Sequence, residues 1–394
     1  MEKTIKLYDT AAYQTEFDAI VLSCEPHPAA PNEKGSTVAL YDIILDQTLF
    51  FPEEGGQSCD TGTIDTHPVL DVQIENDIIR HTMDVPLVPG SRITGCIDWK
   101  LRYSNMQQHS GEHIMSGLIH SHFGYDNVGF HLGSKNVTLD FNGFLTKEQL
   151  ELIETLANEA VYKNLEITAL YPPKTELDGL TYRSKIEIDG PVRIVTIPGY
   201  DICACCAPHV KRTGEIGMIK IVDAIKYKGG IRISILCGSR ALEDYRMKQQ
   251  QMNAVSVLLS AKQDSLDHAV SRLKDENYSL KGQILALQND RIEQKASLIP
   301  ENTKNICLFE ENLESSAHKK YVNLLTEKCS GICAVFVGND ETGYRYIIAS
   351  ASEDVRPINE RLKQDYHAKG GGSREMVQGS LTGQQERLTE IFMH

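Results

Sequence analysis

Residues 109–113 read His109-Ser110-Gly111-Glu112-His113, in the middle of a stretch that the sequence predicts to be one long helix. Asp98 can cap this helix, which we expect to run to about Phe123 because its apolar positions partly follow a 3.6-residue period. Histidines at i and i+4 project from one helix face, so both imidazoles can reach a single metal ion. By itself the pair is weak evidence, because two histidines on a solvated helix face are the more common explanation, so a metal site needs a second source of ligands.

That second source is the stretch 203–209, which reads Cys203-Ala204-Cys205-Cys206-Ala207-Pro208-His209. Thiolate and imidazole together suit zinc, and one pair from each stretch would supply four nitrogen and sulfur ligands. The spacing does not decide which cysteine is the ligand, because Cys205 stands four positions before His209 and Cys206 stands three before it. His120, seven positions after His113, is a reserve ligand near the same helix face, although a core or surface histidine is its more common role.

Glu112 lies next to His113 but does not follow His109 directly, so the stretch lacks the order of the metalloprotease motif with its glutamate base. Successive helix residues point about 100° apart. We therefore expect Glu112 to leave the ligand face and to be an exposed helix carboxylate.

The chain has 394 residues, with 54 acidic and 40 basic side chains and a formal net charge of −14. This composition is typical of a soluble globular protein and excludes a uniformly basic protein that coats nucleic acid, although a local basic patch stays open. Ten cysteines are too few for a secreted disulfide scaffold. Because no long apolar run or signal-like N-terminus is present, we expect a cytoplasmic protein without membrane contact.

The order of the predicted elements indicates an α+β fold in four segments. Residues 1–90 read as short strands and predict a small β-barrel. Residues 91–240 combine helices with β-branched strands and predict a two-layer α+β domain that carries the metal ligands. A helical, coiled-coil-like spacer over 241–298 and a C-terminal α/β domain over 299–394 follow.

Two helical stretches have specific signatures. Thr146 and Gln149 form a capping box in front of an amphipathic stretch to Asn164. From Ala241 to about Ser297 the chain lacks proline, and only Gly282 interrupts the expected helix. Within it, a seam alternates in steps of four and three: Leu266, Val270, Leu273, Asn277, Leu280, Ile284 and Leu287. This heptad spacing favours a homodimer through 241–298, the C-terminal domain or both, with an intramolecular partner helix as the alternative.

Four strings follow one another along the chain: Phe50-Phe51-Pro52-Glu53-Glu54-Gly55-Gly56-Gln57, the HxxxH of His109 and His113, the CxxxH of Cys205 and His209, and Arg212-Thr213-Gly214-Glu215-Ile216-Gly217. Together they resemble the editing domain of alanyl-tRNA synthetases, and more closely the freestanding long-form alanyl-tRNA editing proteins of the AlaX type. The resemblance implies one zinc ion per chain, bound by His109, His113, Cys205 and His209. It also implies a C-terminal domain of the DHH-associated type. The chain departs from the family at Cys206-Ala207-Pro208, where Gly-Gly-Thr is usual.

The implied reaction is hydrolysis of the ester in mischarged alanine tRNA, either seryl-tRNA(Ala) or glycyl-tRNA(Ala), by a zinc-bound water or by one held nearby. A synthetase pocket for alanine rejects serine or glycine poorly, so a second pocket must separate them. By resemblance, Thr138 would contact the serine hydroxyl, while Gly55, Gly56 and Gln57 would close over the substrate. The catalytic side chain is unknown.

Contact with the tRNA acceptor end requires a basic surface on an acidic chain. Basic residues cluster directly after the predicted metal loop, and the C-terminal glycine-rich stretch is flanked by further ones. The predicted tRNA contacts are Lys211, Arg212, Lys226, Lys228, Arg232, Gly371 and Arg374. Two other functions stay open: a non-catalytic tRNA-binding protein with a structural zinc, and a metallohydrolase acting on small esters or amides.

Overall fold

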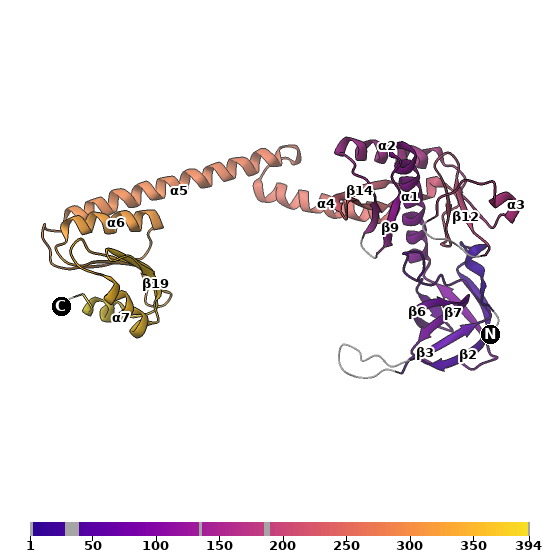
Figure 1. Ribbon diagram of the computed structural model, residues 1–394, viewed down its shortest axis with the longest axis horizontal. Coiled ribbons are helices and arrows are strands. Elements are labelled where there is room, and N and C mark those ends of the chain that lie inside the picture. Colours follow the sequence, from indigo (N-terminus) through magenta and orange to yellow (C-terminus); the bar gives the residue numbers. More distant parts are fainter. Residues whose placement is uncertain (1–2, 28–38, 134–135, 185–189, 393–394) are drawn as a thin grey trace. The chain divides into compact units, whose positions relative to one another are not determined.

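The computed structural model describes residues 3–27, 39–133, 136–184 and 190–392 (Figure 1). The chain divides into two compact units, Met1–Gln251 and Met252–His394. Each unit combines helices with β-sheets, so the predicted α+β class is confirmed. Among the described residues, no helix is long and apolar enough to cross a membrane.

The first part of unit 1 is a closed barrel with the strand order β2-β3-β7-β6-β5-β8. Alternate side chains of its strands point inward, as in β2, where Phe17, Ala19 and Val21 are buried between exposed neighbours. Its strands are β2 (Glu16–Pro26), β3 (Tyr41–Leu45), β5 (Gly62–Ile64), β6 (His67–Glu75), β7 (Ile78–Met83) and β8 (Arg92–Ile97). The short strands β1 (Ile5–Lys6) and β4 (Gln47–Thr48) pair in parallel beside the barrel.

Helix α1 (Trp99–Phe123) forms the centre of the rest of unit 1. Asp98 caps it by accepting a hydrogen bond from the Leu101 backbone N–H at 3.1 Å, and it ends at Gly124, which has a φ of 69°. One side packs on the antiparallel sheet β14-β15-β10-β9, and the helix also contacts β13 of the small sheet β11-β12-β13. Because elements cover it on several sides, every residue from Asn105 to Ile119 is buried.

Two glycines of α1 permit this close packing. A Cβ on Gly111 would lie 2.3 Å from the Cys237 sulfur, and one on Gly117 would lie 2.1 Å from the Tyr200 carbonyl oxygen. The surrounding strands are β9 (Asn127–Leu132), β10 (Val137–Phe141), β11 (Thr168–Leu170), β12 (Ile194–Ile197), β13 (Asp201–Ala204), β14 (Ile219–Tyr227) and β15 (Gly230–Cys237). Any larger residue at either glycine would push the helix away from its neighbours.

A buried ion pair ties α1 to the barrel. Arg102 of α1 donates to Asp60, and both side chains are almost fully buried. Arg102 also donates to the backbone carbonyls of Leu49 and Ala12. Removing one partner of such a buried pair typically costs about 3–5 kcal/mol. The barrel and the α1 layer are therefore joined through a fully satisfied polar contact.

Helix α2 (Lys147–Lys163) packs on α1 and β14. The predicted capping box is confirmed: the Thr146 side chain accepts from the Gln149 N–H, and the Gln149 side chain accepts from the Thr146 N–H. The helix ends at Asn164 in the left-handed conformation. A one-turn helix, α3 (Lys174–Leu177), and the 3-10 turn η2 (Thr213–Ile216) complete this layer.

The expected single helix over 241–297 is wrong. The structure has two helices, α4 (Gly238–Leu259) and α5 (Leu266–Ser297), joined by a turn that includes η3 (Gln263–Ser265). Ser260 has a φ of 48°, and the Ser256 hydroxyl donates to the Ala261 carbonyl, which stops α4. Gly282, the residue expected to interrupt the helix, lies inside α5 without breaking it.

The rest of unit 2 is a sheet in the order β16-β17-β18-β20-β19, with helices against it. Only the β16–β17 pair among its described ladders is parallel. One apolar cluster joins α5 and α6 to the sheet, and a second cluster involves α7 and α8. The elements are β16 (Ile306–Glu310), α6 (Ser315–Lys328), β17 (Cys333–Asn339), β18 (Gly343–Ala349), α7 (Arg356–Tyr366), β19 (Lys369–Gly372), β20 (Met376–Leu381) and α8 (Gln385–Glu390).

Candidate metal centre and its cavity

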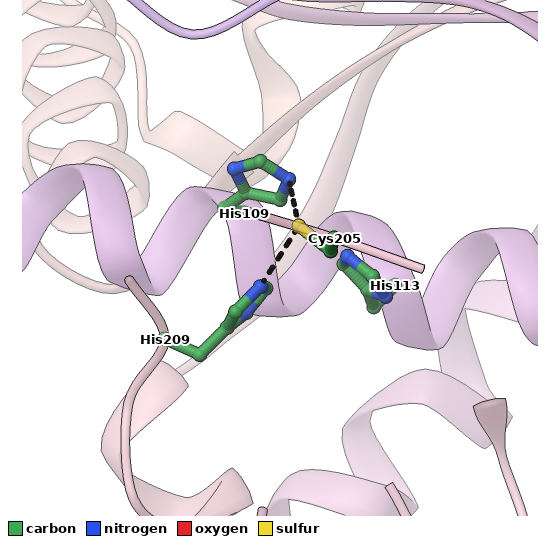
Figure 2. A group of neighbouring side chains, drawn as sticks. All are labelled: His109, His113, Cys205 and His209. Carbon is green, nitrogen blue, oxygen red and sulfur yellow. Dashed lines mark hydrogen bonds between the residues drawn. The ribbon is translucent and has the colours of Figure 1, made fainter. Parts of the chain in front are cut away.

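The structure brings His109, His113, Cys205 and His209 together, with one ligand atom from each within 4.8 Å of the others (Figure 2). The Cys205 sulfur lies 3.5 Å from His109 Nε2 and 3.3 Å from His209 Nε2. The histidines are buried. A sulfur and three imidazole nitrogens facing one small volume have the donor chemistry of a zinc site.

Each histidine is oriented by a hydrogen bond at its other ring nitrogen. The Nδ1 atom of His113 lies 2.7 Å from Asp201 Oδ2, that of His109 lies 2.8 Å from Gln57 Oε1, and that of His209 lies 3.0 Å from Ser110 Oγ. Such partners fix the tautomer and direct Nε2 toward the metal. The residues present therefore fit a bound metal ion.

The ligands come from two places in unit 1. Helix α1 presents His109 and His113 from one face, as the i, i+4 spacing predicts. Cys205 and His209 lie in the loop after β13. The buried side chain of Arg193 holds this loop, because its Nη1 donates to the carbonyls of Cys205 at 3.0 Å and of Ala207 at 2.8 Å. Arg193 thus sets the path of the loop between the two ligands.

The charges around the cluster favour a thiolate at Cys205. Burial alone would raise its pKa, but the charge of His109 and hydrogen bonds from His109 and His113 outweigh that effect and hold the pKa well below its usual value. Burial lowers the pKa of His209 to about 3, which keeps that ring neutral. The pKa of Cys206, in contrast, is raised by burial and by the neighbouring Cys205 charge. Cys205 is therefore the thiol suited to bind a cation.

Asp201 controls the charge on His113. Burial would raise the Asp201 pKa, but hydrogen bonds from His113 and from Arg183 lower it below its usual value. Arg183 donates from Nε and Nη2 at 2.7 and 2.8 Å. Although burial opposes a charge on His113, the Asp201 bond raises its pKa well above the usual value, so a metal ion must displace a proton from this ring.

Of two expectations about residues near the ligands, the exposure of Glu112 is wrong, whereas the more common role of His120, that of a core or surface histidine, is confirmed. Glu112 is not exposed: it is 2% exposed and accepts hydrogen bonds from Ser116 and Asn127, because α1 is enclosed beyond its ligand face. His120 lies away from the cluster, where its ring pairs with Asp126 at 3.0 Å on the surface. His120 is therefore excluded as a reserve ligand.

A cavity of about 870 Å³ opens onto the cluster, within unit 1. His109, His113 and Cys205 form part of its wall. Other lining residues are Glu54, Gly55, Phe130, Tyr171, Arg193 and Cys206. A cavity of this size is comparable to the pockets that hold small-molecule ligands. Its mixture of apolar and charged groups beside a metal-binding cluster makes it the candidate reaction site.

The predicted glycine loop meets this cavity, but Gln57 does not close over it. Gly55 and Gly56 have φ values of 62° and 82°, and a Cβ on Gly56 would lie 2.4 Å from the Phe130 carbonyl oxygen, so both positions favour glycine. Gln57 is 1% exposed and lies against His109, whose ring nitrogen it accepts from. Gln57 therefore supports the ligand His109 from behind. The predicted contact between Gln57 and the substrate is wrong.

The predicted contact between Thr138 and the serine hydroxyl is also wrong. On β10 the side chains of Val137, Leu139 and Phe141 are buried against the α1 layer. Leu139 pairs with Phe130, which lines the cavity, so Thr138 points to the opposite face of the sheet. A residue one position away in a strand cannot reach the cavity without a register shift.

The predicted tRNA contacts lie on separate elements. Lys211 and Arg212 are exposed before η2, and the Lys211 ammonium lies over the Tyr13 ring at 4.5 Å. Lys226 and Lys228 are exposed at the β14–β15 hairpin. In unit 2, exposed Gly371 lies on β19, and Arg374, also exposed, follows that strand.

Arg232 differs from the other predicted contacts, because its charge is already engaged. Its guanidinium donates to both oxygens of Asp140 at 2.6 and 2.7 Å and stacks on Tyr227 at 3.7 Å. Arg232 is therefore poorly placed to bind a phosphate.

Sequence reasoning missed the residues that support the site. Asp201, Arg183, Arg193 and Ser110 act through contacts between segments far apart in the chain, which spacing does not reveal. Asp201 stands two positions before Cys203, and this closeness to the cysteine cluster was its only local signal.

Comparisons with known proteins connect the chain with aminoacyl-tRNA synthetases and with alanyl-tRNA editing proteins. Two family models match: "Threonyl and Alanyl tRNA synthetase second additional domain" over residues 192–234, and "tRNA synthetases class II (A)" over residues 2–101. The first match contains Cys205 and His209.

Alanyl-tRNA editing proteins match this chain over nearly their full length. The alanyl-tRNA editing protein Aarsd1 of Rattus norvegicus is 27% identical over 95% of this chain and 94% of its own length. Aarsd1-A of Xenopus laevis is 27% identical over 95% and 93%. An alanine–tRNA ligase of Ignicoccus hospitalis is 30% identical over 71% of this chain but only 31% of its own length. The length of the matches, the two family models and the histidine–cysteine cluster together support one conclusion: this chain is similar to the alanyl-tRNA editing proteins of the AlaX type over nearly its full length.

Proposed function

We propose that this chain is an aminoacyl-tRNA deacylase that hydrolyses the ester of mischarged alanine tRNA. Seryl-tRNA(Ala) is the main substrate proposed, and glycyl-tRNA(Ala) is the second. The observation that carries the proposal is the cavity of about 870 Å³ whose wall includes three members of the His/Cys cluster. The editing activity named for the full-length relatives supports the same reaction.

His109, His113, Cys205 and His209 would hold one zinc ion. When bound, zinc polarises an ester carbonyl and makes a bound water more acidic. Asp201, Gln57 and Ser110 keep the three rings turned toward the cluster. Buried Arg193 fixes the loop that carries Cys205 and His209, so the ligand set is held before substrate arrives.

The cavity wall supplies the groups that would select the amino acid. Gly55 lines the wall without a side chain, and its φ of 62° favours glycine at this position. Tyr171 and Glu54 bring polar atoms to the same wall. A pocket that hydrogen-bonds the serine hydroxyl would spare alanine, which lacks that group.

The proposed partner is alanine tRNA, bound through its acceptor end in the cytoplasm. Lys211, Arg212, Lys226, Lys228, Gly371 and Arg374 are exposed and remain proposed contacts, whereas Arg232 is paired with Asp140. We also propose a homodimer, because the heptad residues Val270, Leu273, Leu280, Ile284 and Leu287 of α5 are 42–69% exposed. Such an apolar row on a long helix is typical of a coiled-coil seam.

One observation favours a second function. Four protein ligands around one zinc are typical of a closed, structural site, and the chain would then bind tRNA without cleaving it. The two functions are separated by incubating seryl-tRNA(Ala) and alanyl-tRNA(Ala) with the protein. We expect faster loss of the seryl ester than in buffer, with the alanyl ester spared. Loss of the seryl ester at the buffer rate would exclude the editing function.

A further inference from the structure

Two lysines near the N-terminus line the same cavity as the metal-binding cluster. The ammonium groups of Lys3 and Lys6 both donate to Asp77, at 2.7 Å to Oδ2 and 2.9 Å to Oδ1. Two cations on one carboxylate leave a net charge of about +1. A positive group therefore borders a cavity that holds His109, His113 and Cys205 in its wall, in a chain whose formal net charge is −14.

The backbone holds these lysines in place. Thr4, between them, is 4% exposed, its N–H donates to the Asp77 carbonyl at 3.0 Å, and its hydroxyl accepts from the Ile79 N–H at 3.1 Å. Asp77 itself lies in the β6–β7 hairpin turn, where it and Asn76 have φ values of 62° and 52°. The backbone between the two lysines is thus fixed to the barrel by buried hydrogen bonds, and Asp77 directs their side chains, of which Lys3 is 76% and Lys6 25% exposed.

The lysines also keep donors for a ligand. An ammonium group has three N–H donors, and the structure gives each lysine one side-chain bond, to Asp77. Asp77 stays ionised at neutral pH, because hydrogen bonds from Lys3 and then Lys6 lower its pKa to about 2. Its charge therefore orients the lysines without removing their net positive charge.

The proposed substrate carries a matching anion. The ester is on the ribose of the terminal nucleoside, and the phosphate on the 5′ side of that nucleoside is the nearest negative group of the RNA. We propose that Lys3, Lys6 and Asp77 form the binding site for this phosphate, while the aminoacyl ester lies at the His/Cys cluster of the same cavity. This inference rests on the proposed deacylase function. The lysines are positioning residues, since they bind the RNA and not the reacting ester.

The test compares a substrate with the phosphate and one without it. Lys3→Gln/Lys6→Gln should raise the KM for seryl-tRNA(Ala) about tenfold with little change in kcat, because two charge-assisted contacts are lost. The KM for 3′-O-seryladenosine, which has no phosphate, should stay the same. Lys147→Gln/Lys163→Gln is the matched control: both lysines are on α2 outside the cavity, and the change in charge is equal.

A binding arm keeps the inference separate from the deacylase proposal. An uncharged acceptor-stem RNA hairpin ending in CCA should bind the Lys3→Gln/Lys6→Gln variant about tenfold more weakly than the control variant, and with a salt slope about 0.7 smaller for each lost contact. Asp77→Asn, which raises the local charge, should bind it at least as tightly as the unaltered chain. The inference would be overturned if the two lysine double variants bound the hairpin equally. It would also be overturned if the KM for seryl-tRNA(Ala) and the KM for 3′-O-seryladenosine rose equally. Failure of the unaltered protein to cleave either ester would instead reject the deacylase function, and the hairpin result would still decide the phosphate site.

Discussion

The two long helices α1 and α5 reverse the usual relation between polarity and burial. Helix α1 is almost fully buried from Asn105 to Ile119, although this stretch includes glutamine, histidine, serine and glutamate. Helix α5 presents apolar residues to the surface, with Leu273 53% and Leu287 69% exposed. Buried polar groups are costly unless paired, and exposed apolar rows commonly mark interaction surfaces. The difference separates a site built inside unit 1 from a surface of unit 2 that can meet a partner.

The polar residues of α1 are tolerated because each finds a partner on another element. Gln108 exchanges hydrogen bonds with the Cys237 backbone in both directions, at 2.8 Å each. Glu112 accepts from Ser116 and Asn127. An unpaired buried group would cost about 1–3 kcal/mol, so the helix depends on this complete pairing. His109 and His113 differ from these residues, since their Nε2 atoms face the cluster instead of a protein donor.

The largest effect is expected when the metal cluster is broken. Cys205→Ala removes the sulfur that faces His109 and His209, so we expect loss of bound zinc and a fall in deacylation of more than about 100-fold. Metal content per chain and the seryl ester assay measure both. Cys203→Ala is the control, because Cys203 is buried with its pKa raised to about 11 and lies beside the cluster. Equal zinc loss in both variants would mean that the thiol is assigned wrongly.

A smaller effect is expected from the hydrogen bond behind His113. Asp201→Asn removes the carboxylate that orients this ring and pairs with Arg183, so zinc affinity should fall about 10–100-fold. Asp126→Asn is the matched control, since Asp126 also pairs with a histidine, His120, but on the surface. Competition with a chelator measures both affinities. If the surface variant lost as much zinc affinity as the buried one, orientation of His113 would not be the cause.

The local parts of the fold and site could be predicted from the sequence. The cap at Asp98, the box of Thr146 and Gln149 and the i, i+4 histidines depend on residues within a few positions, and the structure contains each of them. Their stabilising bonds form within one turn of helix, so spacing is enough to identify them.

The failures all depend on contacts between distant segments or on strand register. Glu112 was expected to be exposed, because the sequence pattern identifies the ligand face of the helix but not the strands that cover its other faces. Thr138 was assigned to the substrate, but the face it occupies depends on the pairing of Leu139 with Phe130. Gln57 was expected to cover the substrate, whereas its place is set by His109, which lies 52 positions away. The Ser260 turn lacks the glycine or proline that usually marks a helix end, so it gave no signal.

The smallest effect on the folded chain is expected on α5, where a change should alter assembly but not the site. In the heptad seam, one set of positions holds Val270, Asn277 and Ile284, and the other holds Leu266, Leu273, Leu280 and Leu287. β-branched residues and one asparagine in the first set, with leucine in the second, favour a parallel two-stranded coil. The unaltered chain should therefore scatter light as twice its mass of 44.0 kDa.

Leu280→Lys places a charge in the centre of this seam. We expect it to give the single-chain mass while changing the free energy of unfolding of the isolated chain by no more than about 0.5 kcal/mol, because Leu280 is 55% exposed. Tyr278→Lys, on the same helix but outside the seam and 83% exposed, should remain dimeric. Zinc content and deacylation should match the unaltered chain in both variants, since every proposed ligand lies in unit 1. A single-chain mass for the unaltered protein would contradict the dimer, whereas zinc loss in Leu280→Lys would mean that the exposed helix and the buried site are not independent.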